Sequence, residues 1–138
     1  MAHPYKQMIS LEQSVAEFGS VDPKLRELVK IRASQINGCA YCLKMHTDDA
    51  RALGEDDARM HVVAGWREAP NVFDERERAA LELTEAMTLM RAPGDAYDRV
   101  RELFGDEDAE ALLWQVIAIN SWNRMAVTRR TEPEFAAG

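Results

Sequence analysis

The sequence predicts an all-α fold, formed by one domain of about six to seven helices across residues 1–138. Three observations lead to this prediction. Apolar residues recur at three- and four-residue spacing along most of the chain. Helix-capping and helix-breaking residues punctuate that pattern. No alternation of apolar and polar residues is long enough to indicate a strand, and no linker or internal repeat divides the chain.

Local signals predict the first three helices. An apolar stripe between residues 11 and 18 indicates an N-terminal helix. Asp22-Pro23 supplies an N-cap followed by a proline at the first helical position, so the next helix is predicted over about 23–36. Gly38 suits the left-handed conformation that ends a helix, and a third helix is predicted over 39–53.

Capping residues also predict the next two helices. Asp56 or Glu55 can cap a helix that continues to just before Pro70. Asp74 followed by Glu77 forms a capping-box pattern, and apolar residues then recur at helical spacing as far as residue 90. We expect this helix to be the most clearly amphipathic one in the chain.

The last part of the chain is predicted to form a short helix over about 97–104 and a long one over about 108–129. The stretch 112–119 is apolar on nearly every side, which indicates burial in a core or against a partner chain. Polar residues at 120–123 interrupt it, and because buried amides need partners, this segment either faces a pocket or ties to a neighbouring loop. We expect core or subunit-contact roles for the tryptophans, Trp66, Trp114 and Trp122.

The composition is that of an ordinary globular protein with a net charge of −7. It contains no long cluster of lysine and arginine, which argues against nucleic acid or an anionic membrane surface as the main partner. No apolar run approaches the ~20 residues that a membrane span needs. The first residues lack the features of a secretory signal, so we expect a cytoplasmic location, where cysteines are kept as thiols.

Both cysteines and one of the three histidines fall in one short segment. Cys39 and Cys42 are three residues apart and His46 follows four residues later, so all three project from one face of a helix. Cα atoms at the cysteine spacing lie about 5 Å apart, which is compatible with a disulfide. The pair can therefore oxidise and reduce while the helix stays folded.

A reactive thiol must be ionised, and a free cysteine is only about 3% ionised at pH 7. The N–H groups at the start of the helix favour a thiolate at Cys39, whereas His46 lies closest to Cys42. The sequence leaves open which sulfur is the nucleophile. Glu27 lies about ten residues before the turn at Gly38, and an antiparallel hairpin would bring its carboxylate toward His46 as an orienting group or proton acceptor.

Two other interpretations compete with redox chemistry. Free cysteines are often buried as small hydrophobic residues. A zinc site could combine Cys39, Cys42 and His46 with a carboxylate or His61, but structural zinc sites usually draw a second ligand pair from another knuckle, and the chain has no second Cys-x-x-Cys. We therefore predict no metal and no cofactor, and we expect His61 to lie at the surface or the edge of the core.

The chain resembles the AhpD-like alkylhydroperoxidases of the carboxymuconolactone decarboxylase superfamily. The resemblance rests on Glu27, on the Cys39-Ala40-Tyr41-Cys42 motif and on His46, with further similar stretches at 66–70, 77–88 and 119–124. It covers roughly residues 12–130. It implies a compact helical domain that oligomerises through helical contacts, commonly as a trimer or hexamer.

The resemblance also implies roles for the site residues. Cys42 is the peroxidatic cysteine, whose thiolate attacks the O–O bond to give a sulfenic acid, and Cys39 resolves that acid as a disulfide. Glu27 and His46 match the relay that takes a proton from Cys42 and gives one to the departing alkoxide. The best-known peroxidase members carry a histidine just before the second cysteine, where this chain has Tyr41, so the relay is one imidazole short.

The predicted function is therefore that of an AhpD-type, thiol-dependent peroxidase that reduces small organic hydroperoxides at the expense of a dithiol reductant. The resemblance implies a lipoylated protein as that reductant. Two alternatives stay open. One is a carboxymuconolactone decarboxylase-like lyase that uses His46 or His61 as a base and is indifferent to both cysteines. The other is a non-catalytic oligomeric module whose disulfide responds to redox conditions.

Overall fold

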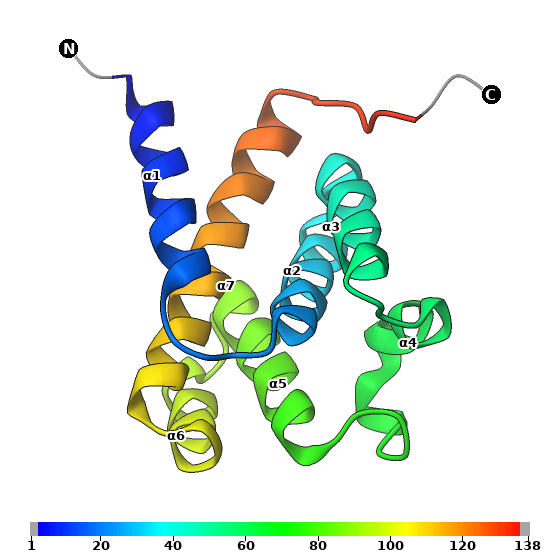
Figure 1. Ribbon diagram of the computed structural model, residues 1–138, viewed down its shortest axis with the longest axis vertical. Helices are drawn as coiled ribbons and strands as arrows, with labels where there is room; N and C mark the ends of the chain where they lie inside the picture. Colours follow the sequence, from blue (N-terminus) through cyan, green and yellow to red (C-terminus); the bar gives the residue numbers. More distant parts are fainter. Residues whose placement is uncertain (1–2, 136–138) are drawn as a thin grey trace.

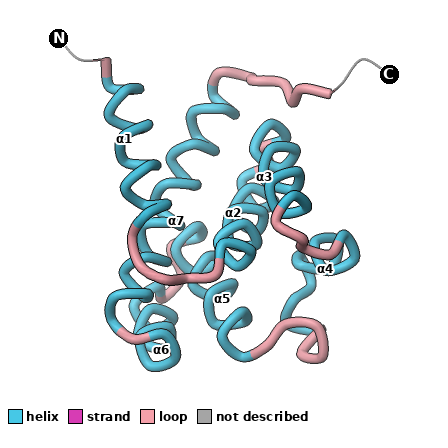
Figure 2. Tube along the Cα trace, in the orientation of Figure 1, coloured by secondary structure: helices cyan, strands magenta, loops and turns pink. Residues whose placement is uncertain are grey.

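The structure is a computed structural model that describes residues 3–135, which form seven α-helices and one 3₁₀ segment (Figure 1). In chain order these are α1 (Pro4–Glu17), α2 (Pro23–Asn37), α3 (Ala40–Ala52), α4 (Asp57–Val62), η1 (Val63–Glu68), α5 (Glu75–Leu89), α6 (Pro93–Phe104) and α7 (Asp106–Thr128). The described range contains no strand (Figure 2), so the predicted all-α fold is confirmed. None of the helices in that range is both long and apolar enough to cross a membrane.

Helix starts that the sequence predicted from capping residues agree with the structure. α2 begins at Pro23, and the Asp22 side chain accepts a hydrogen bond from the N–H of Lys24 at 2.9 Å. At the start of α5, the Asp74 side chain accepts a hydrogen bond from the N–H of Glu77 at 2.8 Å, and the Glu77 side chain accepts one from the N–H of Asp74 at 3.0 Å. An N-cap typically stabilises a helix by about 1 kcal/mol, so local sequence is sufficient to define these two ends.

Three details differ from the sequence predictions. The helix expected to reach Pro70 ends at Val62 and continues as η1, within which Gly65 leaves helical geometry (φ −108°, ψ 28°). α6 begins at Pro93 rather than near residue 97, because proline suits the first turn of a helix. α5 is not a one-sided amphipathic helix, because it packs against α2, α6, α7 and η1, and its buried residues are Ala79, Ala80, Leu81, Leu83, Thr84, Glu85 and Ala86.

α2 lies in the middle of the bundle (Figure 1), packed against α3, α5 and α7. Its Leu25 and Val29 belong to one hydrophobic cluster, which is completed by α5, α6 and α7. Its Leu28 and Ile31 belong to a second cluster with residues of α3, α4, η1 and α5. Burial of such a side chain contributes about 1.5–3 kcal/mol, so the helix that carries Glu27 is firmly held on two sides.

α1 is packed less deeply than the other long helices, because Val15 is its one buried residue. It lies against α7, and Arg26 of α2 holds its C-terminal end by donating hydrogen bonds to the carbonyl oxygens of Val15 (3.0 Å) and Phe18. In Figure 1 the N-terminal half of α1, the C-terminal half of α7 and α3 all extend toward the same end of the molecule. The candidate site lies between these three helices.

Candidate active site

A tight turn between α2 and α3 places the Cys-x-x-Cys segment. Gly38 adopts the left-handed conformation (φ 66°) that favours glycine. The N–H groups of Gly38 and Cys39 donate to the carbonyl oxygens of Gln35 and Ser34, at 3.3 and 3.0 Å. Cys39 is the N-cap residue of α3, and its Sγ accepts a hydrogen bond from the N–H of Cys42 at 3.2 Å. The first cysteine therefore sits at the positive end of a helix.

Cys39 and Cys42 form a disulfide, with their Cα atoms 5.3 Å apart. This agrees with the spacing of about 5 Å predicted for such a pair on a helix. α3 keeps helical geometry from Ala40 to Ala52 with the bond in place, so oxidation of the pair is compatible with a folded helix. Both side chains are buried, with exposures of 1% and 3%.

The hairpin brings Glu27 of α2 to His46 of α3. Glu27 Oε2 lies 3.0 Å from His46 Nδ1, and both side chains are buried. The other carboxylate oxygen, Oε1, accepts a hydrogen bond from Lys30 Nζ at 2.9 Å. Because an ionised carboxylate only accepts hydrogen bonds, Nδ1 donates in this contact, and whenever the imidazole is neutral its Nε2 is left as an acceptor.

The surroundings of Glu27 keep it ionised. Burial alone would raise the pKa of its carboxyl group, but the hydrogen bond from His46 and the positive charge of Lys30 outweigh that effect and lower the pKa below its ordinary value. Lys30 was not among the site residues predicted from the sequence. Its position three residues after Glu27 on the same helix was an available signal, because side chains at that spacing are neighbours.

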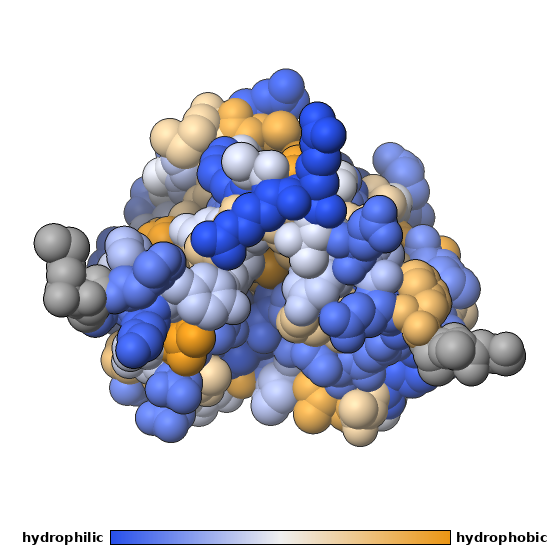
Figure 3. Space-filling view, turned by 90° about the horizontal axis from the view of Figure 1, so that it is seen from above, coloured by the Kyte–Doolittle hydropathy of each residue, from blue (hydrophilic) through white to orange (hydrophobic). Residues whose placement is uncertain are grey.

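A cavity of about 450 Å³ opens beside these groups, between α1, α3 and α7. Its lining residues are Tyr5, Glu12, Tyr41, Cys42, Met45, His46, Trp122, Met125, Ala126, Arg129 and Thr131. Figure 3 looks onto this end of the molecule and shows mainly hydrophilic surface around a central hollow, with apolar surface at depth. The volume of the cavity falls within the range of about 300–1,000 Å³ that is typical of small-molecule sites.

The cavity distinguishes the two cysteines. Cys42 lines it together with His46 and Tyr41, whereas Cys39 lines a different cavity next to Ala40 and Val127. The sequence left open which sulfur is the nucleophile, and of the two, Cys42 is the one that lines the cavity with His46. The structure also places Tyr41, which stands where the best-known AhpD peroxidases have a histidine, in the same lining.

Other expectations for aromatic and histidine residues have mixed outcomes. Trp66 is buried in the core, as predicted. Trp114 is 39% exposed and lies outside the core. Trp122 lines the cavity rather than the core, because α1 packs beside α7 and leaves that face of α7 open to the site. His61 is exposed, in agreement with the prediction of a surface position.

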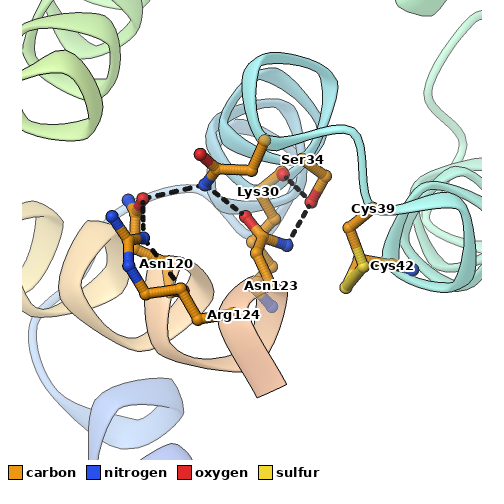
Figure 4. The surroundings of a disulfide bond; sticks show 8 residues. Lys30, Ser34, Cys39, Cys42, Asn120, Asn123 and Arg124 are labelled. Carbon is orange, nitrogen blue, oxygen red and sulfur yellow. Dashed lines mark hydrogen bonds between the residues drawn. A yellow bond between two sulfur atoms is a disulfide. The ribbon is translucent and has the colours of Figure 1, made fainter. Parts of the chain in front are cut away.

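A network of amide side chains fastens the cysteine turn to α7 (Figure 4). Asn37, at the end of α2, donates through Nδ2 to Asn120 Oδ1 and to Asn123 Oδ1, at 2.9 and 3.0 Å. Asn123 donates to Ser34 Oγ at 3.0 Å, and Ser34 donates in turn to the carbonyl oxygen of Lys30 at 2.7 Å. The polar interruption of the long helix therefore ties to the end of α2, while its Trp122 faces a pocket.

The zinc set considered from the sequence is not assembled in this structure. The two cysteines are bonded to each other, and His61 lines a separate cavity with Thr47. Among residues 3–135, Glu27, His46 and Asp49 have potential ligand atoms within 4.8 Å of one another. Glu27 already forms an ion pair with Lys30 there, and the ammonium group of Lys30 would repel a cation.

Comparisons with known proteins show the family of this chain. A sequence model described as the carboxymuconolactone decarboxylase family matches residues 4–86, which is more than half of the chain. The chain belongs to the carboxymuconolactone decarboxylase family. The uncharacterized protein YdfG of Bacillus subtilis (strain 168) is 42% identical to this family member over 125 residues, which cover 88% of this chain and 84% of YdfG.

Solved structures place this carboxymuconolactone decarboxylase family member with AhpD-like proteins. A protein of unknown function from Agrobacterium tumefaciens, described as a candidate antioxidant defence protein AhpD, superposes with a TM-score of 0.88 at 34% identity, over 96% of this chain and 92% of that one. The debrominase Bmp8 superposes with a TM-score of 0.82 over 93% of this chain and 69% of its own. At 17% identity, Bmp8 shares the fold alone. The predicted AhpD-like membership is confirmed.

Proposed function

We propose that this AhpD-like protein reduces small organic hydroperoxides, with Cys42 and Cys39 as its redox pair. One observation carries the proposal: Cys42 and His46 line the same cavity, and Glu27, which is buried, lies 3.0 Å from His46 Nδ1. A thiol that faces a substrate-sized cavity next to an oriented imidazole has the parts that an activated nucleophile needs.

In the first step, His46 Nε2 accepts the thiol proton of Cys42. The thiolate attacks the terminal oxygen of the hydroperoxide, so that an S–O bond forms as the O–O bond breaks. The departing alkoxide takes the proton back from the imidazolium and leaves as an alcohol. Glu27 holds the imidazole in the required tautomer and stabilises its charged form, and Lys30 positions Glu27.

In the second step, the Cys39 thiolate attacks the sulfur of the Cys42 sulfenic acid. The S–S bond forms as the S–O bond breaks, and the hydroxide takes up the proton that the Cys39 thiol released and leaves as water. The N–H of Cys42, which donates to Cys39 Sγ, stabilises this thiolate at the helix N-terminus. The cysteines are already at disulfide distance, so the step needs no unfolding of α3.

An external dithiol completes the cycle. Its thiolate attacks Cys42, the sulfur that lines the cavity, and Cys39 leaves as the thiolate that the helix N-terminus stabilises. The second thiolate of the donor then attacks the donor sulfur of this mixed disulfide, so that the donor leaves as a disulfide and Cys42 is released as a thiolate. The AhpD resemblance favours a dihydrolipoyl group on a partner protein as that dithiol. A cytoplasmic location and a trimeric or hexameric assembly stay part of the same proposal.

The test mixes reduced full-length protein with cumene hydroperoxide and dihydrolipoamide at pH 7 and follows the loss of peroxide. We expect repeated turnover, and no turnover after both thiols have been blocked with iodoacetamide. Peroxide loss that survives alkylation would contradict the thiol mechanism and favour the lyase alternative. A protein that forms its disulfide but never turns over peroxide would be a redox-responsive module instead.

Glu27→Gln is expected to lower kcat/KM for the hydroperoxide about 10²-fold, within the usual contribution of general acid–base catalysis. Glutamine has the same shape, but its neutral amide does not stabilise an imidazolium, and its NH₂ group can favour the wrong histidine tautomer. Initial rates at pH 7 measure the effect.

The matched control is Asp49→Asn. Asp49 Oδ2 also lies near His46 Nδ1, at 3.8 Å, but its side chain is 56% exposed. Solvent screens such a carboxylate, so we expect a rate within about twofold of the wild-type rate. Equal losses of rate in the two variants would mean that the summed negative charge near His46, rather than the buried contact with Glu27, supports the rate.

A further inference from the structure

The wall of the cavity that faces α3 is built from α1 and α7 and carries two aromatic side chains. Tyr5 of α1 and Trp122 of α7 meet edge to face, with ring centroids 5.7 Å apart and an interplanar angle of 79°. The indole Nε1 of Trp122 donates to Glu12 Oε2 at 3.0 Å. With its only donor occupied, the indole offers apolar surface to the cavity, and Met125 and Ala126 extend that surface.

Two charged side chains from this wall also line the cavity, and their situations differ. Glu12 is engaged by Trp122 and lies 4.0 Å from Lys30 Nζ. Arg129, at the C-terminal end of α7, is exposed and lies over the Tyr5 ring, with its guanidinium carbon 5.9 Å from the ring centroid. Within residues 3–135, no carboxylate comes within 4.0 Å of the Arg129 guanidinium. The α1–α7 wall therefore presents an apolar, aromatic surface and one positive charge without a countercharge.

We infer that the substrate accepted by this cavity is a hydroperoxide with an aromatic or branched apolar body and a carboxylate group, which Arg129 binds. The inference rests on the proposed function and names its substrate class. The apolar body packs against Tyr5 and Trp122, the carboxylate pairs with Arg129, and the peroxide group meets Cys42 on the α3 side. Arginine is suited to this role because its planar guanidinium can bind a carboxylate with two hydrogen bonds.

The experiment compares cumene hydroperoxide with the same molecule carrying a carboxylate para to the peroxide-bearing carbon. We expect wild-type kcat/KM to be about tenfold higher for the carboxylated peroxide, as one added charge-assisted contact would give. The ratio between the two substrates should fall toward one in Arg129→Gln and be partly restored in Arg129→Lys. It should also shrink as ionic strength rises, because salt screens the charge.

Arg130→Gln is the matched control, since Arg130 is the next residue and lines the other cavity, beside Cys39. Arg130→Gln should keep the wild-type ratio. A ratio near one in the wild type, or an equal loss in the Arg129 and Arg130 variants, would overturn the inference, because any preference would then reflect the general field of the helix end.

Binding measurements separate this inference from the proposed function. The alcohols that correspond to the two peroxides lack the O–O bond, so their binding does not depend on peroxide chemistry. Titration of each alcohol into the oxidised protein, followed by NMR, should show about tenfold tighter binding of the carboxylated alcohol, and Arg129→Gln should remove that difference. Tighter binding of the carboxylated alcohol without peroxide turnover would contradict the proposed function alone. Peroxide turnover without this difference in binding would contradict this inference alone.

Discussion

In the absence of a dithiol donor, reduced Cys39→Ser is expected to consume one equivalent of hydroperoxide and stop with a sulfenic acid on Cys42. The variant retains the peroxidatic thiol, His46 and Glu27 but has no second thiol to form a disulfide. Serine is a good N-cap residue and can accept the N–H of Cys42 in place of the sulfur, so α3 should keep its start. Mass spectrometry after labelling with dimedone, which reacts with sulfenic acids, identifies the oxidised residue.

Cys42→Ser is the matched variant, and we expect it to consume no peroxide at all. Its one remaining thiol, Cys39, is 1% exposed and does not line the cavity with His46. Wild-type protein should consume one equivalent and end as the disulfide. A dimedone label on Cys39 in the Cys42→Ser protein, together with an inert Cys39→Ser protein, would mean that the two cysteines have the opposite roles.

The part of the site that could be predicted from the sequence is the part that a single hairpin builds. Asp22-Pro23 and Gly38 define the ends of α2 locally. Because the turn after α2 is short, α3 folds back along α2. The predicted approach of Glu27 to His46 followed from that geometry, and the observed distance is 3.0 Å. The spacing of Cys39 and Cys42 likewise determined that they could bond.

The opposite wall of the cavity could not be predicted in this way. Tyr5 and Glu12 reach the site only because α1 packs on α7. Glu12 and Trp122, which form a hydrogen bond across this contact, are more than one hundred residues apart in the sequence. The apolar periodicity of a helix assigns its tryptophan to the core. It does not show which face of that helix the neighbouring helices leave uncovered. The placement of Trp122 and Arg129 around the cavity is a property of the tertiary packing.

The break between α4 and η1 has a similar origin. The sequence pattern continues through Met60, Val63 and Trp66, yet the chain leaves α-helical geometry after Val62. In the folded protein, Trp66 Nε1 donates to Glu85 of α5 at 2.8 Å, and Arg67 also pairs with Glu85. A long-range acceptor on α5 therefore fixes where η1 lies, and Gly65, which weakens a helix, is a local signal within this segment.

Glu85→Gln is expected to lower the free energy of unfolding by about 3 kcal/mol at pH 7, as breaking a buried ion pair commonly does. Glu85 is 9% exposed, and its Oε1 accepts hydrogen bonds from Trp66 Nε1 and from Arg32 Nε, at 2.8 and 2.9 Å. Glutamine would leave Arg32 without a countercharge and would turn an NH₂ group toward one of the three donors. Urea unfolding measures the loss, and Glu82→Gln is the control on the same helix, with an expected change below about 0.5 kcal/mol.

The pH dependence of that difference tests whether the charge of Glu85 is its source. Burial would raise the pKa of Glu85, but hydrogen bonds from Arg67, Trp66 and Arg32 outweigh burial and lower the pKa in the folded protein. A lowered folded pKa contributes stability that is fully present above the unfolded value of about 4.3 and is lost as the pH falls through the folded value. The gap between wild type and Glu85→Gln should therefore stay constant from pH 6 to 8 and narrow in acid. A gap that closed between pH 6 and 8 would have to come from another group.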